Sequence, residues 1–327
     1  MNCNKKFNPF ANWLDIRKLL LTPPPPMDHV LPGLLAGTVG MLAGPGGVGK
    51  TMFELQLALA VACGGSICGG LLETSKLTFP LSRKPGKVVL VAAEESVEVF
   101  WHRLHAVAAT LVNNSQLLGI DASPAELLDL WDENLHIVPL AGMGPVTLLD
   151  SNHEEVQDSV ESLLSLCTGA RLVMLDPIRQ FHNCDENDSR AMSKLVQILQ
   201  VVAFKSRAAV VFAHHTNRAS AQLGLGDTSG AARGSTALSD GVRWQLNLSQ
   251  PTVELARQQG INALDRKGFV AVDIAKANYM SQQPTTILQR LPGGVLMVLN
   301  DTQGQGAECK NRASRPSAKS QRKWAQE

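Results

Sequence analysis

The stretch Gly44-Pro45-Gly46-Gly47-Val48-Gly49-Lys50-Thr51 decides the fold expected for this chain. It matches the GxxxxGK[ST] pattern of a phosphate-binding loop, and it lies between a strand-like run at 38–42 and a helix-like segment at 51–62. Glycines let successive backbone N–H groups surround a phosphate, and the start of the helix adds its dipole. The predicted ATP-binding residues are Gly44, Gly46, Gly47, Val48, Gly49, Lys50, Thr51 and Met52. Lys50 should reach the terminal phosphates and Thr51 should bind Mg²⁺.

The rest of the chain alternates strand-like and helix-like segments. Short apolar runs occupy 38–42, 87–92, 135–139, 171–175 and 208–213, and helical patterns occupy 51–62, 97–112, 153–166 and 189–206. This alternation predicts an α/β fold with a mostly parallel sheet flanked by helices. Shorter strand-like runs follow at 242–248, 269–275, 285–290 and 295–299. They predict antiparallel strands added to the sheet towards the C-terminus.

Composition excludes several classes of protein. Apolar residues make up 44% and charged residues 18%, which is typical of a globular protein and excludes disorder of the whole chain. The net charge of +1 provides no overall attraction to nucleic acid, and the six scattered cysteines favour neither a zinc site nor a disulfide framework. We find no secretory signal and no apolar run long enough for a membrane span. We therefore expect a cytoplasmic protein with no membrane partner.

The chain divides into three parts. Residues 1–26 form an N-terminal arm that ends in four prolines, 23–26, with a short amphipathic helix predicted at 13–21. Residues 27–302 form the ATPase domain. Residues 303–327 form a basic tail, expected to be disordered, with six Lys or Arg against two Glu after residue 306. One hypothesis is that the proline spacer lets the arm helix reach a neighbouring protomer.

Acidic and histidine residues follow several predicted strands, at the edge where open α/β sheets bind ligands. Asp176 ends the apolar run 171–175 and should complete the Mg²⁺ site. Glu94, in preference to Glu95, should orient the attacking water, although a solvated acidic cap is the alternative. His214 and His215 end the run 208–213, where one of them could sense the γ-phosphate.

The segment 216–234 contains four glycines and two arginines, Arg218 and Arg233, and it is longer than a simple connection needs. We interpret it as a mobile loop that contacts phosphates, or alternatively as a surface loop without a partner. Arg103 and Arg243 are candidate arginine fingers that would reach the ATP of a neighbouring subunit. An ordinary surface ion pair is the more frequent role for any one arginine.

These residues resemble the RepA-type hexameric replicative helicases of broad-host-range plasmids, within the larger RecA-like ATPase family. The resemblance runs from about residue 27 to 294, and the matching stretches are DHVLPGLLAGTVGMLAGPGGVGKTM, AAEESVEVFWHRLHAV, LVMLDPIRQFHNCDEN, VVFAHHTNRAS, ARGSTALSDGVRW and AKANY. Two segments depart from the pattern, namely the stretch 69–87 and the tail. Asn278 stands where the wider replicative helicase group carries a basic residue, which leaves Lys276 uncertain and puts more weight on Arg243.

The resemblance implies a RecA-like core that assembles as a homo-oligomeric ring of six, translocates on single-stranded DNA and unwinds duplex in plasmid replication, with plasmid replication proteins as further partners. The catalytic residues it implies are Lys50, Glu94, His215, Arg103 and Arg243, with Thr51 and Asp176 at the metal and the loop after His215 lining a central channel. Two other readings remain open. One is a regulatory RecA-like ATPase or scaffold without unwinding activity, and the other is a small-molecule kinase.

Overall fold

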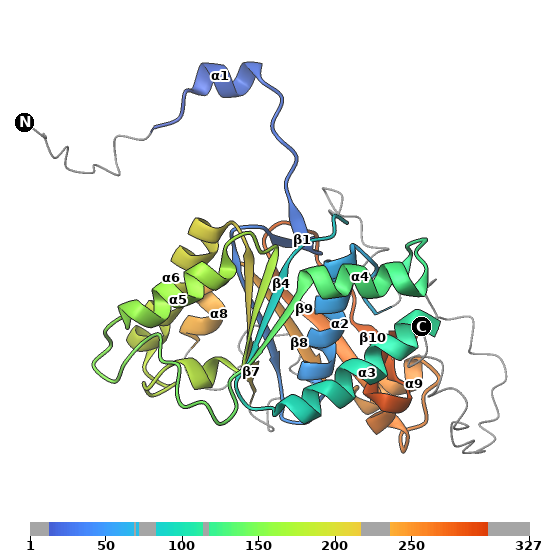
Figure 1. Ribbon diagram of the computed structural model, residues 1–327. Coiled ribbons are helices and arrows are strands. Elements are labelled where there is room, and N and C mark those ends of the chain that lie inside the picture. Colours follow the sequence, from blue (N-terminus) through green and yellow to red (C-terminus); the bar gives the residue numbers. More distant parts are fainter. Residues whose placement is uncertain (1–12, 69, 72–82, 114–117, 217–235, 300–327) are drawn as a thin grey trace, which may run out of the picture.

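The computed structural model describes residues 13–68, 70–71, 83–113, 118–216 and 236–299. Within these ranges the core is a nine-stranded sheet with the order β11-β10-β9-β8-β3-β7-β6-β4-β5 (Figure 1). The six neighbouring strands β8, β3, β7, β6, β4 and β5 are parallel to one another. The pairs β8–β9, β9–β10 and β10–β11 are antiparallel. The strands are β3 (Val39–Gly44), β4 (Val88–Ala92), β5 (Leu135–Pro139), β6 (Leu172–Asp176), β7 (Ala209–His215), β8 (Trp244–Ser249), β9 (Phe269–Ala277), β10 (Thr286–Arg290) and β11 (Leu296–Val298).

The predicted α/β fold with C-terminal antiparallel strands is confirmed, with one correction. We expected the run 242–248 to begin the antiparallel extension, but β8 pairs parallel with β3, Gly40 opposite Trp244. Strand β8 follows α8 (Ala237–Gly241) and runs in the same direction as β3. A strand pattern carries no information about direction, which is why the sequence could not supply it.

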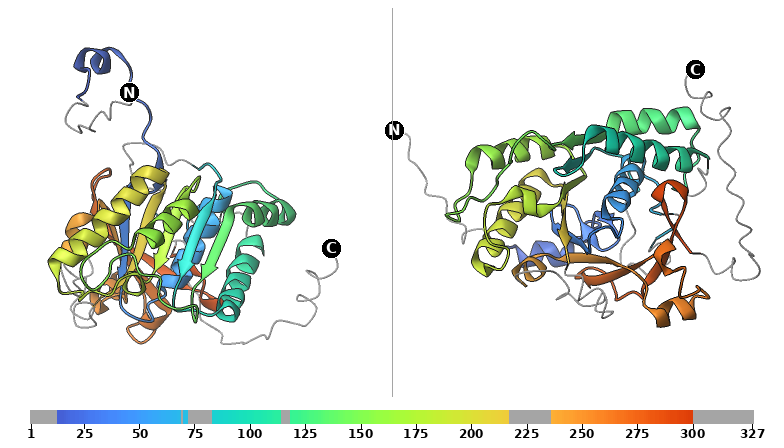
Figure 2. Two further views of the ribbon diagram at one scale, coloured as in Figure 1. Left: turned by 60° about the vertical axis from the view of Figure 1, so that its left-hand side comes forward. Right: turned by 90° about the horizontal axis from the view of Figure 1, so that it is seen from below.

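Helices cover both faces of the sheet (Figure 2). One face packs α2 (Lys50–Cys63), α3 (Val97–Asn113) and α4 (Pro124–Asn134), and the other packs α5 (Gln157–Cys167), α6 (Ser189–Ser206) and α8. The parallel strands supply both cores because alternate side chains point to opposite faces: Val88 and Leu90 join the first core, and Val89 and Val91 join the second. This burial on both faces explains why the strands appear in the sequence as continuous apolar runs.

Some elements differ from the prediction. Helix α4 was missed, although Ser123 and Glu126 form a capping box and Pro124 opens the helix, which are readable start signals. Helix α5 begins at Gln157 rather than at 153, because Leu149 and Glu155 pair across a turn just before it. The smaller elements are β1 (His29–Leu31), β2 (Leu34–Leu35), η3 (Ile178–Phe181), α9 (Val253–Gln258), η6 (Arg266–Gly268) and η7 (Pro292–Gly294).

The arm contains a helix, α1, shorter than expected at Ile16–Leu21. None of its residues is buried, and its leucines are exposed by 53% to 81%. Residues 1–12 of the arm and the tail 303–327 lie outside the described residues, so the three-part division stays a prediction. Among the described helices, none has the length and apolar character that a membrane crossing requires.

Candidate active site

The loop between β3 and α2 has the shape that its sequence predicts. Gly47 and Gly49 have φ angles of 78° and 106°, which side-chain-bearing residues rarely adopt. A Cβ on Gly44 would lie 2.8 Å from the Leu248 carbonyl oxygen of β8, so that position also requires glycine. Apart from the glycine itself and its chain neighbours, no described residue has an atom within 4 Å of where a Cβ would stand on Gly46 or Gly47. The loop is therefore open to a ligand beside these two residues, where phosphates would bind.

Lys50 is buried at the centre of this loop. Its Nζ donates to the carbonyl oxygens of Gly44 (2.8 Å) and Pro45 (3.3 Å) and lies 3.1 Å from Nδ1 of His215. Burial lowers the pKa of Lys50, and the negative charges of Asp176, Glu54 and Glu94 oppose that shift. Among the described residues no acid forms an ion pair with Lys50. Its ammonium group is available to an anionic ligand such as the phosphates of ATP.

Thr51, the last residue of the loop motif, contacts Asp176 at the end of β6. The Thr51 hydroxyl donates to Oδ2 of Asp176 at 2.9 Å, and Asp176 is 8% exposed. A hydroxyl and a carboxylate at this separation provide the hard oxygen ligands that Mg²⁺ prefers. The pair fits the metal ion that accompanies ATP in P-loop enzymes.

Glu94 follows β4, the strand next to β6. Ala92 is in register with Asp176, and the Ala93 N–H donates to the Asp176 carbonyl oxygen at 2.8 Å. Glu94 is exposed and accepts a 3.3 Å hydrogen bond from Gln180 Nε2. Glu95, by contrast, forms an ion pair with Arg103 at 2.7 Å. Glu94 thus has the freer carboxylate of the two, as expected of a group that orients water.

Glu54 is an acidic residue of this site that the sequence analysis missed. It lies on α2 with 0% exposure, next to the Asp176 side chain, which acts on its carboxyl group through charge and a hydrogen bond. Burial first, and then the charge of Asp176, raise its pKa well above the usual value. Glu54 stands three residues after Thr51 on the same helix, a spacing that places both side chains on one face and could have revealed it.

The candidate arginine fingers lie elsewhere. Arg243 precedes β8, and its N–H donates to the Val39 carbonyl oxygen at 3.2 Å. Val39 begins β3 and the loop follows its end, so Arg243 is about 17 Å of strand away from its own loop. Arg243 therefore cannot serve the ATP of its own chain. Arg103 is held by Glu95, while Arg218 and Arg233 lie outside the described residues.

Lys276 is a further cation that the sequence analysis considered. Its Nζ donates to the carbonyl oxygens of Ser239 (2.9 Å) and Asp240 (3.2 Å) in α8. These bonds satisfy carbonyl groups at the end of a helix and give Lys276 a structural role inside its own chain.

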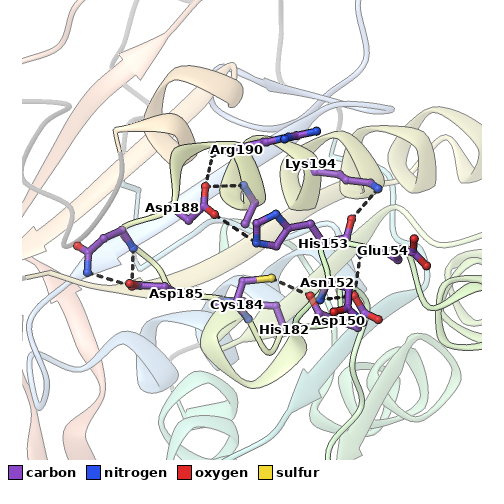
Figure 3. Close-up of polar contacts among 12 residues, drawn as sticks. Asp150, Asn152, His153, Glu154, His182, Cys184, Asp185, Asp188, Arg190 and Lys194 are labelled. Carbon is purple, nitrogen blue, oxygen red and sulfur yellow. Dashed lines mark hydrogen bonds and ion pairs between the residues drawn. The ribbon is translucent and has the colours of Figure 1, made fainter.

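A pocket of about 330 Å³ opens beside the loop. It is lined by Gly46, residues 177–179, Glu186 and residues 213–216. A polar network joins the segments 150–154 and 182–190 of the chain (Figure 3). In it, Asp188 accepts the N–H groups of Arg190 and Ala191 at the start of α6 and pairs with His153 at 3.2 Å. The Cys184 thiol donates to the Asp150 carbonyl oxygen at 3.0 Å, so the segments 150–154 and 182–188 support each other.

The phosphate-binding loop, its buried lysine and the paired threonine and aspartate agree with a match of residues 4–221 to the AAA domain family. The chain belongs to the AAA domain family. It is a P-loop ATPase, which implies ATP binding, typically with Mg²⁺, and ATP hydrolysis. The roles of Lys50, Glu94, His215, Arg103 and Arg243 in this chain stay predictions.

Two solved structures are similar to this chain. The ATPase domain of G40P matches with a TM-score of 0.54 and 16% identity over 87% of this chain and 96% of that one. A DnaB-like replicative helicase, solved to show its interactions with primase, matches with a TM-score of 0.52 and 16% identity over 84% of this chain. This chain spans 63% of that helicase chain. At this identity the likeness establishes the RecA-like fold, which confirms the predicted fold class.

Proposed function

We propose that this ATPase is a DNA helicase that translocates on single-stranded DNA and unwinds duplex during plasmid replication, working as a homo-oligomeric ring of six subunits. The motif resemblance to plasmid replicative helicases and the fold shared with a DnaB-like replicative helicase support this proposal. In it, Thr51 and Asp176 hold Mg²⁺ with ATP, Lys50 binds the terminal phosphates, and Glu94 orients the attacking water. Arg243 reaches the ATP of the neighbouring subunit.

The contact between Lys50 and His215 is the observation that favours a motor over a simple ATPase. The two side chains lie 3.1 Å apart, and His215 ends β7 immediately before the segment 216–234, which we predict to contact DNA. A phosphate that binds Lys50 competes with this contact. ATP binding and hydrolysis would therefore change the contacts of His215 at the base of the DNA-binding segment.

Steady-state ATP hydrolysis with and without single-stranded DNA tests the proposal. We expect DNA to stimulate hydrolysis by the parent, Lys50→Ala to abolish hydrolysis under both conditions, and His215→Ala to reduce the stimulation more than the DNA-free rate. His136→Ala is the matched control, because His136 is an exposed residue of β5, at the far edge of the sheet. A strand-separation assay with the same variants then tests unwinding.

Hydrolysis by the parent that is indifferent to DNA would contradict the motor. It would favour the regulatory ATPase or scaffold, whose ATP site would be the same. Phosphoryl transfer to a small molecule in place of water would favour the kinase.

A further inference from the structure

The C-terminal antiparallel strands are hydrogen-bonded to α2, the helix that follows the phosphate-binding loop. Gln56 of α2 is 2% exposed, and its side chain makes two hydrogen bonds with one residue of β11. Its Nε2 donates to the Leu296 carbonyl oxygen at 2.7 Å, and its Oε1 accepts the Leu296 N–H at 2.7 Å. This paired contact fixes the hairpin of β10 and β11 against the second turn of α2.

Arg290, the last residue of β10, continues this contact into the loop itself. Its Nη2 donates to the Val48 carbonyl oxygen at 2.9 Å. A Cβ on Gly49 would lie 3.1 Å from Nη1 and 3.3 Å from Nη2, so the guanidinium group occupies the space beside Gly49. In a phosphate-binding loop the N–H groups face the ligand. The Val48 carbonyl group faces the hairpin instead. The hydrogen bond from Arg290 therefore holds the loop on the side opposite the ligand.

Arg290 also brings a charge to the loop. Within the described part of the chain no carboxylate forms an ion pair with it, and its one hydrogen bond goes to the loop. A half-buried guanidinium without an acidic partner raises the local positive potential. An anion bound in the loop would supply the missing negative charge.

We infer that Arg290 is a positioning residue of the nucleotide site, which holds Val48 and Gly49 in their phosphate-binding conformation and adds a second positive charge beside the loop. The antiparallel hairpin is then part of the ATPase machinery rather than only an extension of the sheet. This inference rests on the loop 44–51 being the ATP site. It does not depend on DNA binding or unwinding.

Nucleotide affinity provides the test. The dissociation constant of a fluorescent ADP analogue and the melting temperature of the nucleotide-free protein are measured for the parent, Arg290→Ala, Arg290→Lys and Gln289→Ala. Gln289 is the matched control, because neighbouring strand residues point to opposite faces. Loss of one charged hydrogen bond predicts about tenfold weaker binding by Arg290→Ala. Arg290→Lys, which keeps the charge, should recover part of the affinity, and Gln289→Ala should bind like the parent.

Measuring KM and kcat for ATP hydrolysis in the same variants extends the test from binding to catalysis. Because Arg290 acts on binding, the KM of Arg290→Ala should rise while kcat at saturating ATP changes much less. Parent-like affinity in Arg290→Ala overturns the inference. The inference is also overturned if Arg290→Ala loses affinity only in proportion to its lower melting temperature, and Gln289→Ala or Arg290→Lys loses as much affinity. Undiminished nucleotide binding by Lys50→Ala would instead contradict the assignment of the ATP site itself.

Discussion

The Thr51 hydroxyl donates a 2.9 Å hydrogen bond to Oδ2 of Asp176, joining the phosphate-binding loop to the end of β6. If this pair holds Mg²⁺, Asp176→Asn should lower kcat for ATP hydrolysis by at least about 100-fold, because the metal supplies several kcal/mol of charge stabilisation. Hydrolysis is measured across a range of Mg²⁺ concentrations. Asp150→Asn, in the network of Figure 3, is the control. A parent-like kcat in Asp176→Asn would rule out this role.

Glu94 should orient the attacking water. Glu94→Gln keeps the shape of the side chain and removes its charge, so we expect hydrolysis to fall by about 10² to 10⁴ while nucleotide affinity stays near that of the parent. Glu95→Gln is the matched control, because Glu95 is engaged with Arg103. If the two variants exchange these outcomes, Glu95 is the residue that orients water.

Arg243 should act on the ATP of a neighbouring subunit. Alone, Arg243→Ala should bind nucleotide normally but hydrolyse it about 10³-fold more slowly. Mixed with Lys50→Ala subunits it should regain activity, because the Lys50→Ala subunit still offers Arg243 to the intact loop next to it. Mixing with Arg243→Ala,Lys50→Ala double variants is the control and should give no recovery. Arg103→Ala is measured in parallel, and recovery seen only with that variant would identify Arg103 as the finger.

Glu54 should make the stability of the nucleotide-free and Mg²⁺-free protein fall as pH rises. In the unfolded chain its carboxyl titrates near 4.5, whereas burial and Asp176 raise its pKa in the folded protein. Between these two values the folded state binds more protons, so this stabilising contribution is complete below pH 4.5 and is lost as pH rises through the folded pKa. Glu54→Gln should remove a slope of up to about 1.4 kcal/mol per pH unit from the free energy of unfolding.

Denaturant unfolding of parent and Glu54→Gln at several pH values between about 5 and 8 measures this difference. Glu155→Gln, at a position outside the site, controls for the loss of one negative charge. Identical pH profiles for parent and Glu54→Gln would show that Glu54 is not protonated in the folded protein.

The arm should stabilise the oligomer. Helix α1 has an exposed apolar surface, with Leu20 81% and Leu21 74% exposed. We expect deletion of residues 1–22 to lower the mass measured by light scattering at a given concentration. Replacing Leu20 and Leu21 by serine in the full chain should do the same, since it removes the apolar surface alone. An unchanged mass in both variants would exclude this role.

Much of the fold could be predicted because its signals are local. The parallel strands are short apolar runs buried on both faces. The phosphate-binding loop is one continuous motif, so roles for Lys50 and Thr51 could be predicted from it directly. Helix α4 was missed although its capping residues were present. The direction of β8 could not be predicted, because it depends on how the chain crosses between β7 and β8.

The candidate site also has a part that local sequence determines and a part that depends on the tertiary structure. The sequence by itself determined the class of protein and the residues of the loop, since a glycine pattern between a strand and a helix dictates backbone shape and phosphate chemistry over eight neighbouring positions. Only the tertiary structure brought His215 to Lys50 and Arg290 to Val48. These contacts join residues 165 and 242 positions apart. Strand order and packing decide which distant side chains meet, and no local pattern encodes that order.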